Sequence, residues 1–284
     1  MIPAPRARAW APRRVRPAAV LLWLAMGSLL LLWIAPIVWM VTTAVKPTPE
    51  IFARPPRWFP RTPTVHHAVV VVTSWPFLRW LLNSAIVAGA TTCLSTLVSI
   101  PAAFGFARLR WRGRDALFLL FLSSMLIPLE VNVVPLYFLM NRLHLLNTYP
   151  AVFLPMVGMP IGIFLLRQFF LNIPGELDDA ARVDGCGNVR ILWHVILPLS
   201  RPALAALGIY MFTFAWNEFF WSMIALQSPR MFTLPIGLRA LQGAYDIDYG
   251  ILMAGSALAS LPALVVFILL QRSIIRGIAM TAHR

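Results

Sequence analysis

The sequence predicts an all-α, polytopic membrane protein with six transmembrane helices. Three observations support this fold class. Only 12% of the 284 residues are charged, whereas soluble domains carry roughly 25%. The hydrophobic share is 60%, and the mean hydropathy is +0.76. The apolar residues also gather in six long runs, without the alternation that is typical of a membrane β-barrel.

Each apolar run is long enough to cross a bilayer as a helix. A helix rises about 1.5 Å per residue, so about 20 residues cross a hydrocarbon core of about 30 Å. Because backbone groups cannot remain unpaired in lipid, these runs are expected to be helical. Two of them contain one carboxylate each, Glu130 and Glu218. The predicted spans are residues 18–45, 80–107, 116–141, 143–166, 202–229 and 249–271.

The rest of the chain is organised around these spans. Residues 1–17 are basic and resemble the start of a signal peptide. The apolar run that follows is too long for a signal peptide, so residues 18–45 are expected to be retained as the first span. We expect an extracytoplasmic loop at 46–79 and a core of five helices at 80–277. A cytoplasmic elbow at 174–199 and a C-terminal tail at 278–284 complete the predicted organisation.

The distribution of arginine predicts the orientation. With both termini in the cytoplasm, the inner side receives roughly twice as many positive charges as the outer side, as the positive-inside rule requires. The cluster "RLRWRGR" at 108–114 is the firmest inner anchor. The segment 46–79 is an exception, because it carries most of the positive charge that is expected outside.

Several function classes are disfavoured by the residues present. The net charge is +14, but the arginines flank apolar runs and form no basic face with interleaved aromatics, which argues against nucleic-acid binding. Cys93 and Cys186 suggest neither a disulfide framework nor a metal site, and His66 with His67 lacks further ligands at suitable spacing. No catalytic residues are predicted. Lys46 is the only lysine and follows no glycine-rich turn, so the chain has no phosphate-binding loop of its own.

The elbow is a short acidic stretch between two apolar runs. Pro174 suits the first turn of a short helix, where its missing N–H costs nothing. Three acids then lie near the positive end of the helix dipole, and Ala180 with Ala181 would let another surface approach closely. The acids are Glu176, Asp178 and Asp179.

A second short helix is predicted at 189–197. Gly185 suits a left-handed helix end, Asn188 suits the start of the next helix, and Pro198 is expected to end it. The elbow is therefore either a docking surface for another subunit or an ordinary amphipathic loop between two spans.

The elbow also resembles a family signature. Asp179-Ala180-Ala181, then Asp184-Gly185, then Val195 to Pro198, is similar to the EAA motif of the permease subunits of bacterial ABC importers. The spacing matches at every step, with Asp179 in place of the usual Glu and Val195 in place of the usual Ile. The segments "LIPLEVNVVPLYFLMNRLHLLNTYPAVFLP" and "WNEFFWSMIAL" resemble the carbohydrate-uptake branch, of the maltose and glycerol-3-phosphate type. The resemblance covers roughly residues 83–277; the end, "AMTAHR", departs from the usual tail.

This resemblance implies a type I ABC importer permease in a bacterial inner membrane. Such a chain is not an enzyme and holds no cofactor, because ATP and Mg²⁺ are bound by partner subunits. The implied partners are a second permease, two ATP-binding subunits, an extracytoplasmic solute-binding protein and membrane lipid. The residues implied to couple to the ATPase are Glu176, Asp179, Ala180, Ala181, Asp184, Gly185, Leu197 and Pro198.

Polar residues inside the apolar runs are candidates for a solute pathway. A carboxylate at the centre of a span costs about 2.5–3.5 kcal/mol on insertion scales, so it should face a cavity or a partner. An aromatic ring, amides and carboxylates together suit the hydroxyls and apolar faces of a sugar. A structural hydrogen-bonding cluster is the alternative. The candidate residues are Glu130, Asn132, Trp216, Asn217 and Glu218.

Three functions remain open from the sequence. The first is a permease for a sugar or for a glycerol-phosphate type of solute. The second is a membrane-embedded enzyme, against which the absence of common nucleophile and metalloprotease motifs argues. The third is a stand-alone secondary transporter, which the lack of an evident inverted repeat disfavours.

Overall fold

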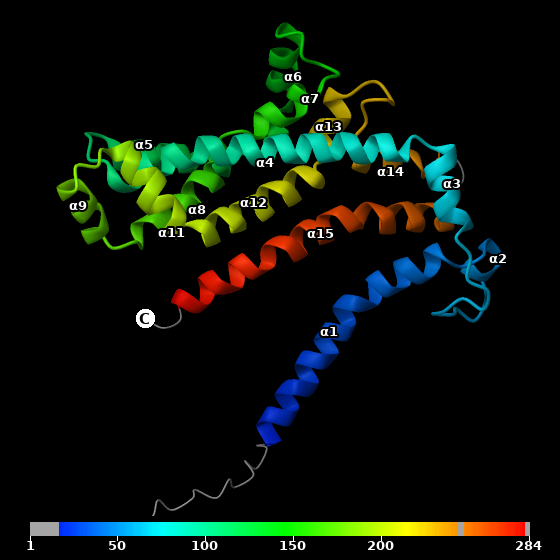
Figure 1. Ribbon diagram of the computed structural model, residues 1–284. Coiled ribbons are helices and arrows are strands. Elements are labelled where there is room, and N and C mark those ends of the chain that lie inside the picture. The colour runs from blue at the N-terminus through cyan, green and yellow to red at the C-terminus, as the bar shows by residue number, and fades with distance from the viewer. Residues whose placement is uncertain (1–16, 244–246, 282–284) are drawn as a thin grey trace, which may run out of the picture.

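The computed structural model describes residues 17–243 and 247–281. Within these ranges every regular element is a helix, as the all-α prediction requires (Figure 1). Most of the predicted N-terminal segment 1–17, and residues 282–284 of the predicted tail, lie outside the described residues. The elements are α1 (Pro17–Ala44), α2 (Thr48–Ile51), α3 (His66–Ser74), α4 (Phe77–Arg108), α5 (Arg114–Ser123), η1 (Ser124–Leu126), η2 (Leu129–Asn132), α6 (Val133–Arg142), α7 (Tyr149–Phe153), η3 (Leu154–Met156), α8 (Pro160–Leu171), α9 (Glu176–Val183), α10 (Asn188–Ile191), η4 (Leu192–Ile196), α11 (Leu197–Leu199), α12 (Arg201–Trp216), α13 (Phe220–Ala225), α14 (Leu234–Ala240) and α15 (Tyr249–Thr281).

Three of the six predicted spans are long continuous helices. They are α1, α4 and α15, with 28, 32 and 33 residues, and each is long and apolar enough to cross a membrane. Their sequences are apolar on nearly all sides, as expected of helices surrounded by lipid and other helices. These three predictions are confirmed.

The other three predicted spans are not continuous helices, which corrects the prediction. In two of them the helical segments bend: 114–126 and 130–142 meet at 84°, and 149–156 and 160–171 meet at 42°. The third, 202–229, is divided into α12 and α13 by the non-helical residues 217–219, and α12 meets the preceding segment 188–199 at 79°. The chain reaches six spans only if each bent pair counts as one. Ile127 and Met159 have extended backbones because each precedes a proline, which disfavours the helical conformation.

The predicted span 143–166 also begins too early. Residues 143–148 form a loop in which His144 and Asn147 have positive φ angles of 54° and 60°. The Asn147 side-chain oxygen accepts hydrogen bonds from the backbone N–H groups of Gln227 and Ser228, at 3.1 and 3.0 Å. Asparagine tolerates this backbone conformation, and here it joins the loop to the segment after α13.

The core is built around α4, which packs against α8 and α12 (Figure 1). Small side chains recur every four residues along α4, at Ser95, Ser99 and Ala103, all fully buried. Gly162 of α8 faces them, and a Cβ atom there would lie 2.7 Å from Ser99 Oγ. Small residues at such positions let membrane helices approach closely.

The two ends of α4 differ in what surrounds them. We call the end at Arg108 the elbow end, because α5, α9 and α11 lie beside it (Figure 1). We call the end at Phe77 the loop end, where α2, α3 and α14 lie (Figure 1). α15 runs from the loop end toward the elbow end, so the two ends correspond to opposite sides of a membrane that the helices cross.

At the loop end, buried polar side chains hold the segment that precedes α14. Asn83 donates to the carbonyl oxygens of Arg230 and Phe232, at 2.9 and 2.8 Å, and accepts from the Tyr149 hydroxyl at 2.7 Å. The Trp80 indole N–H donates to the Pro229 carbonyl at 3.1 Å. Residues 229–233 are therefore fixed to α4 and α7.

The predicted loop 46–79 contains ordered structure, including α2 and α3. Lys46 is 1% exposed; its Nζ donates to the Arg57 carbonyl at 2.6 Å and lies 4.3 Å from the Trp39 ring centroid. Burial lowers the pKa of Lys46. Glu50 accepts from the backbone N–H of Arg61 at 2.9 Å, and this bond is the main cause of its lowered pKa. Hydrogen bonds between the side chains of Lys46 and Glu50 and the backbone of Arg57 and Arg61 thus hold the two parts of this loop together.

Candidate functional site

The first helix of the elbow, α9, is a short acidic helix with its charges placed as predicted. Glu176, Asp178 and Asp179 occupy its first turn, where negative charge interacts favourably with the helix dipole. The backbone N–H groups of Asp178 and Asp179 donate to the Gly175 carbonyl. The prediction that Pro174 lies in the first turn of this helix is wrong, because α9 begins at Glu176, two residues after Pro174.

The turn after α9 is a Schellman motif centred on Gly185. The Gly185 N–H donates to the Arg182 carbonyl at 3.0 Å, and the Cys186 N–H donates to the Ala181 carbonyl at 2.9 Å. Gly185 has a φ angle of 79°, so the predicted left-handed conformation is confirmed. Both hydrogen bonds satisfy carbonyl groups that the end of a helix would otherwise leave free.

The second helix of the elbow differs from the prediction at both ends. Asn188 does not cap it: Asn188 is its first residue, and its side-chain oxygen accepts from Arg182 at 3.0 Å. Pro198 does not end it either, because the helix continues to Leu199. The turn before Pro198, η4, is π-helical. A proline inside a helix removes one hydrogen bond and crowds the carbonyl four residues earlier, so the wider turn accommodates it.

The apolar face of the second helix anchors the elbow to the core. Ile191, Leu192, Ile196 and Leu197 are buried in a cluster with side chains of α4, α8 and α12. The Ser200 hydroxyl then bonds to the Ile196 carbonyl, and the chain turns into α12. Leu197 therefore holds the elbow in place and is not available on its surface.

The first helix is attached in a different way. Asp178 is the only buried residue of α9, at 8% exposure. Its carboxylate lies 3.4 Å from Nε of Arg108, at the end of α4. Arg108 also donates to the Ile173 carbonyl at 2.7 Å. One ion pair thus connects the acidic helix to α4, the helix around which the core is built.

The elbow also exposes large apolar side chains. Val183 is 88% exposed, and Leu177, Val189 and Trp193 are exposed as well. An open hollow of about 560 Å³ is lined by Val189 and Trp193 together with other residues of 185–194. These four residues are not among the predicted coupling residues, although apolar side chains within an otherwise polar elbow were a visible signal. Exposed apolar side chains that cluster in this way favour contact with another protein.

Most of the predicted coupling residues lie on this exposed surface. Ala181 is half-buried, and Leu197 is buried. The remaining six are exposed: Glu176, Asp179, Ala180, Asp184, Gly185 and Pro198.

The predicted solute-pathway residues fall into two groups. Glu130 and Asn132 lie on η2 with exposed side chains. Trp216, Asn217 and Glu218 lie where α12 ends. Within the part of the chain that the structure describes, no hydrogen bond or ion pair joins the two groups.

The second group has local structural partners. The Glu218 carboxylate accepts from the backbone N–H groups of Trp221 and Ser222, at 2.7 and 2.9 Å, and from the Ser222 hydroxyl. It therefore caps the start of α13. The Trp216 indole is buried and donates to the Ala259 carbonyl of α15 at 3.3 Å. Asn217 is exposed and bonds to the Thr213 carbonyl.

No metal-binding arrangement occurs among residues 17–243 and 247–281: no group of three or more His, Cys, Asp or Glu side chains is placed to hold an ion.

Comparison with known proteins gives consistent matches. Residues 95–280 match the family described as "Binding-protein-dependent transport system inner membrane component". The chain is 40% identical over 220 residues to the arabinooligosaccharides transport system permease protein AraQ of Halalkalibacterium halodurans, covering 77% of this chain and 79% of the relative. It is 36% identical to the sn-glycerol-3-phosphate transport system permease protein UgpE of Yersinia pestis, covering 75% and 77%.

The fold is also similar to that of a solved structure. A chain from a bacterial ABC transporter involved in the import of the acidic polysaccharide alginate superposes with a TM-score of 0.80 at 20% identity. The match covers 92% of this chain and 99% of that one.

Proposed function

The chain belongs to the family of binding-protein-dependent transport system inner membrane components, and from this premise we propose that it passes a sugar or sugar-like solute across the membrane. As a member of this family it is a permease subunit without ATPase chemistry of its own. The energy comes from separate ATP-binding subunits, and the solute is delivered by a binding protein.

The observation that carries the proposal is the elbow. It combines a hydrogen-bonded turn, exposed small and acidic residues, and exposed apolar side chains on one short surface. Its second helix is anchored in the core. A rigid projection of this kind suits docking on an ATP-binding subunit and the transfer of a rigid-body movement to the membrane helices.

We further propose that the elbow end faces the cytoplasm and that both termini lie there. The cluster 108–114 and the elbow lie at the same end of α4 (Figure 1), and the positive-inside rule favours the cytoplasm for both. The segment 46–79, with α2 and α3, then lies outside, where its exposed aromatic side chains Trp58 and Phe59 are available to the binding protein. The first two bent helix pairs and α12 supply the remaining three spans, giving a core at 80–277 between this loop and the tail at 278–284.

The sugar class rests on the relatives. The similar permeases carry the names of arabinooligosaccharide and glycerol-3-phosphate systems, so a glycerol-phosphate type of solute is the second candidate. Along the pathway, Glu130, Asn132 and Asn217 expose polar groups that suit solute hydroxyls. The packing of Trp216 and the capping role of Glu218 support a positioning role for these two residues.

Reconstitution in liposomes tests the proposal. The chain is combined with its second permease, the ATP-binding subunits and the binding protein, and uptake is measured for radiolabelled mono-, di- and oligosaccharides and for glycerol 3-phosphate. We expect uptake of a sugar that requires ATP, both sets of partner subunits and the binding protein. Movement of solute by the purified chain alone down an ion gradient would instead identify a secondary transporter.

A further inference from the structure

Among residues 17–243 and 247–281, the Arg108–Asp178 ion pair is the only ion pair of α9, and Asp178 is the only buried residue of that helix. Both side chains are 11% exposed, and Nε of Arg108 lies 3.4 Å from a carboxylate oxygen of Asp178. The neighbouring acid, Asp179, is exposed. Burial of a charge is costly unless the charge is paired, so the position of α9 is tied to that of Arg108.

The rest of α9 is not packed against the neighbouring loop. An open hollow of about 1020 Å³ separates α9 from the loop after α4, lined by Arg110, Trp111 and Arg114 on one side and by Asp179 and Arg182 on the other. Arg108 and Asp178 form part of its wall. A displacement of α9 therefore reaches α4 through the ion pair and through Ala181, which packs against the buried cluster that includes α4 side chains, and not through contacts across the hollow.

The ion pair also has unused bonding capacity. Nε of Arg108 and the second carboxylate oxygen of Asp178 are buried and make no hydrogen bond with the described residues. Charge-assisted hydrogen bonds are about 2.7–2.9 Å long, shorter than the separation here. A small movement of α9 toward α4 would bring Nε of Arg108 and Oδ2 of Asp178, now 3.4 Å apart, into hydrogen-bonding distance.

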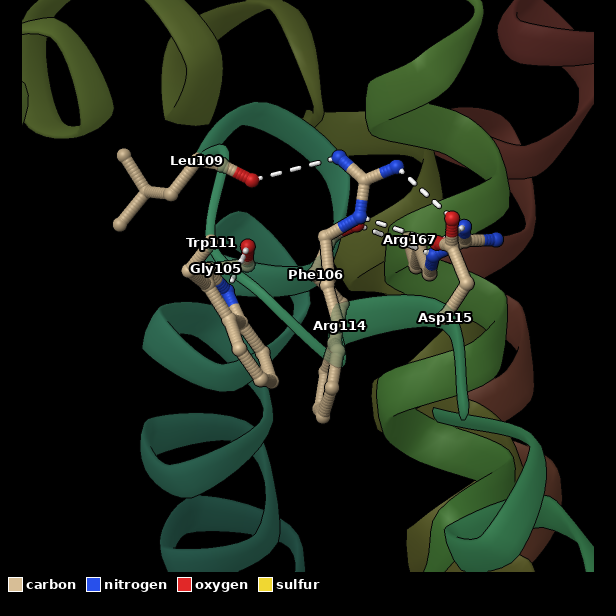
Figure 2. A network of polar contacts seen from close by, with 7 residues as sticks. All are labelled: Gly105, Phe106, Leu109, Trp111, Arg114, Asp115 and Arg167. Atoms are coloured by element: carbon tan, nitrogen blue, oxygen red, sulfur yellow. Dashed lines mark hydrogen bonds and ion pairs between the residues drawn. The ribbon is translucent and has the colours of Figure 1, made fainter. Parts of the chain in front are cut away.

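Arg108 belongs to a part of α4 that is held firmly to two other helices (Figure 2). Arg114 of α5 donates to the Leu109 carbonyl at 3.2 Å and to Asp115 at 2.9 Å. Arg167 of α8 donates to the Phe106 carbonyl at 3.2 Å and lies 3.7 Å from Asp115. The bond from Arg114 is the main cause of the lowered pKa of Asp115. The bonds to the Asp115 carboxylate are therefore weakened as the pH falls through its lowered pKa.

From these contacts we infer that Arg108 and Asp178 are positioning residues for coupling: their ion pair carries the movement of α9 to α4, α5 and α8. This inference rests on the proposed function, because it assumes that α9 is moved by an ATP-binding subunit. The pair contributes by fixing the distance between α9 and α4, and it touches neither solute nor nucleotide.

The test uses the reconstituted transporter with the double variant Arg108→Gln/Asp178→Asn. Removing one partner leaves a buried unpaired charge and can prevent folding, whereas Gln and Asn together remove both charges and keep side chains that can hydrogen-bond to each other. The double variant is expected to assemble with its partners and to hydrolyse ATP, but to move about fivefold less solute per ATP, a size typical of coupling between contacting residues. Arg110→Gln, an exposed arginine of the same loop, is the matched control and should keep the wild-type ratio.

The outcomes separate the two proposals. A wild-type ratio of solute to ATP in the double variant would overturn the inference while leaving the proposed function intact. Failure of the wild-type transporter to couple uptake to ATP would overturn the proposed function itself. The single variant Asp178→Glu keeps the charge, and its ratio of solute to ATP is expected to lie between those of the double variant and the wild type. A ratio as low as that of the double variant would count against the ion pair as the link.

Discussion

Replacing Gly185 with valine is expected to uncouple the transporter while the chain still inserts into the membrane. Gly185 has a φ angle of 79°, and left-handed backbone costs roughly 1–2 kcal/mol for residues other than glycine, more for a β-branched one. The two hydrogen bonds that close the turn would be lost, and α9 would change direction relative to the second helix. Binding to the ATP-binding subunit should weaken about tenfold for each ~1.4 kcal/mol of contact energy lost.

Two variants serve as controls for this result. Gly187 lies two residues further on with an extended backbone, φ −76° and ψ 166°, so Gly187→Val adds the same bulk without the strain. Gly185→Asn adds a side chain that tolerates the left-handed conformation. Both are expected to retain most of the solute-stimulated ATP hydrolysis and most of the co-purification with the ATP-binding subunits. Equal behaviour of Gly185→Val and Gly187→Val would contradict the role of the turn.

Replacing Gly237 with alanine is expected to destabilise the loop end. A Cβ atom at this position would lie 2.1 and 2.3 Å from two atoms of the Trp80 ring. Trp80 is buried, and its indole is fixed by the bond to the Pro229 carbonyl, so the ring cannot move aside without breaking that contact. Overpacking of this kind costs typically 1–3 kcal/mol, which should lower the thermal unfolding midpoint of the purified protein in detergent.

Gly89→Ala provides the matched control, because a Cβ atom there meets nothing within 4 Å and alanine favours a helix more than glycine does. Its midpoint should be unchanged or slightly higher. A Gly237→Ala midpoint equal to that of Gly89→Ala would show that the contact between α14 and Trp80 is not as tight as the structure has it.

The sequence was sufficient for features that depend on local residues. Uniform apolar runs predicted α1, α4 and α15, and a glycine after an acidic helix predicted the left-handed turn at Gly185. The bends at Pro128 and Pro160 were predictable in principle from the backbone restriction before proline. Length and hydropathy alone could not place them, because a broken helix and a straight one can have the same composition.

Features that depend on distant partners could not be predicted. Nothing in the pattern distinguishes Asp178 from Asp179, because the difference arises from Arg108, which is far away in the sequence. Glu218 was a candidate for the solute pathway with a structural hydrogen-bonding role as the alternative, and the apolar run around it does not indicate that its carboxylate caps α13. Asn188 was expected to cap its own helix, and it bonds to Arg182 of the preceding one.

The central claim is that the elbow contacts an ATP-binding subunit on the inner side of the membrane. Photo-crosslinking in the assembled transporter tests it most directly, with Val183→p-benzoylphenylalanine on the elbow and Phe59→p-benzoylphenylalanine on the loop after α2. Both side chains are exposed, at 88% and 69%. The account predicts a covalent product with the ATP-binding subunit from position 183 and none from position 59. No such product from position 183, or one from position 59, would contradict it.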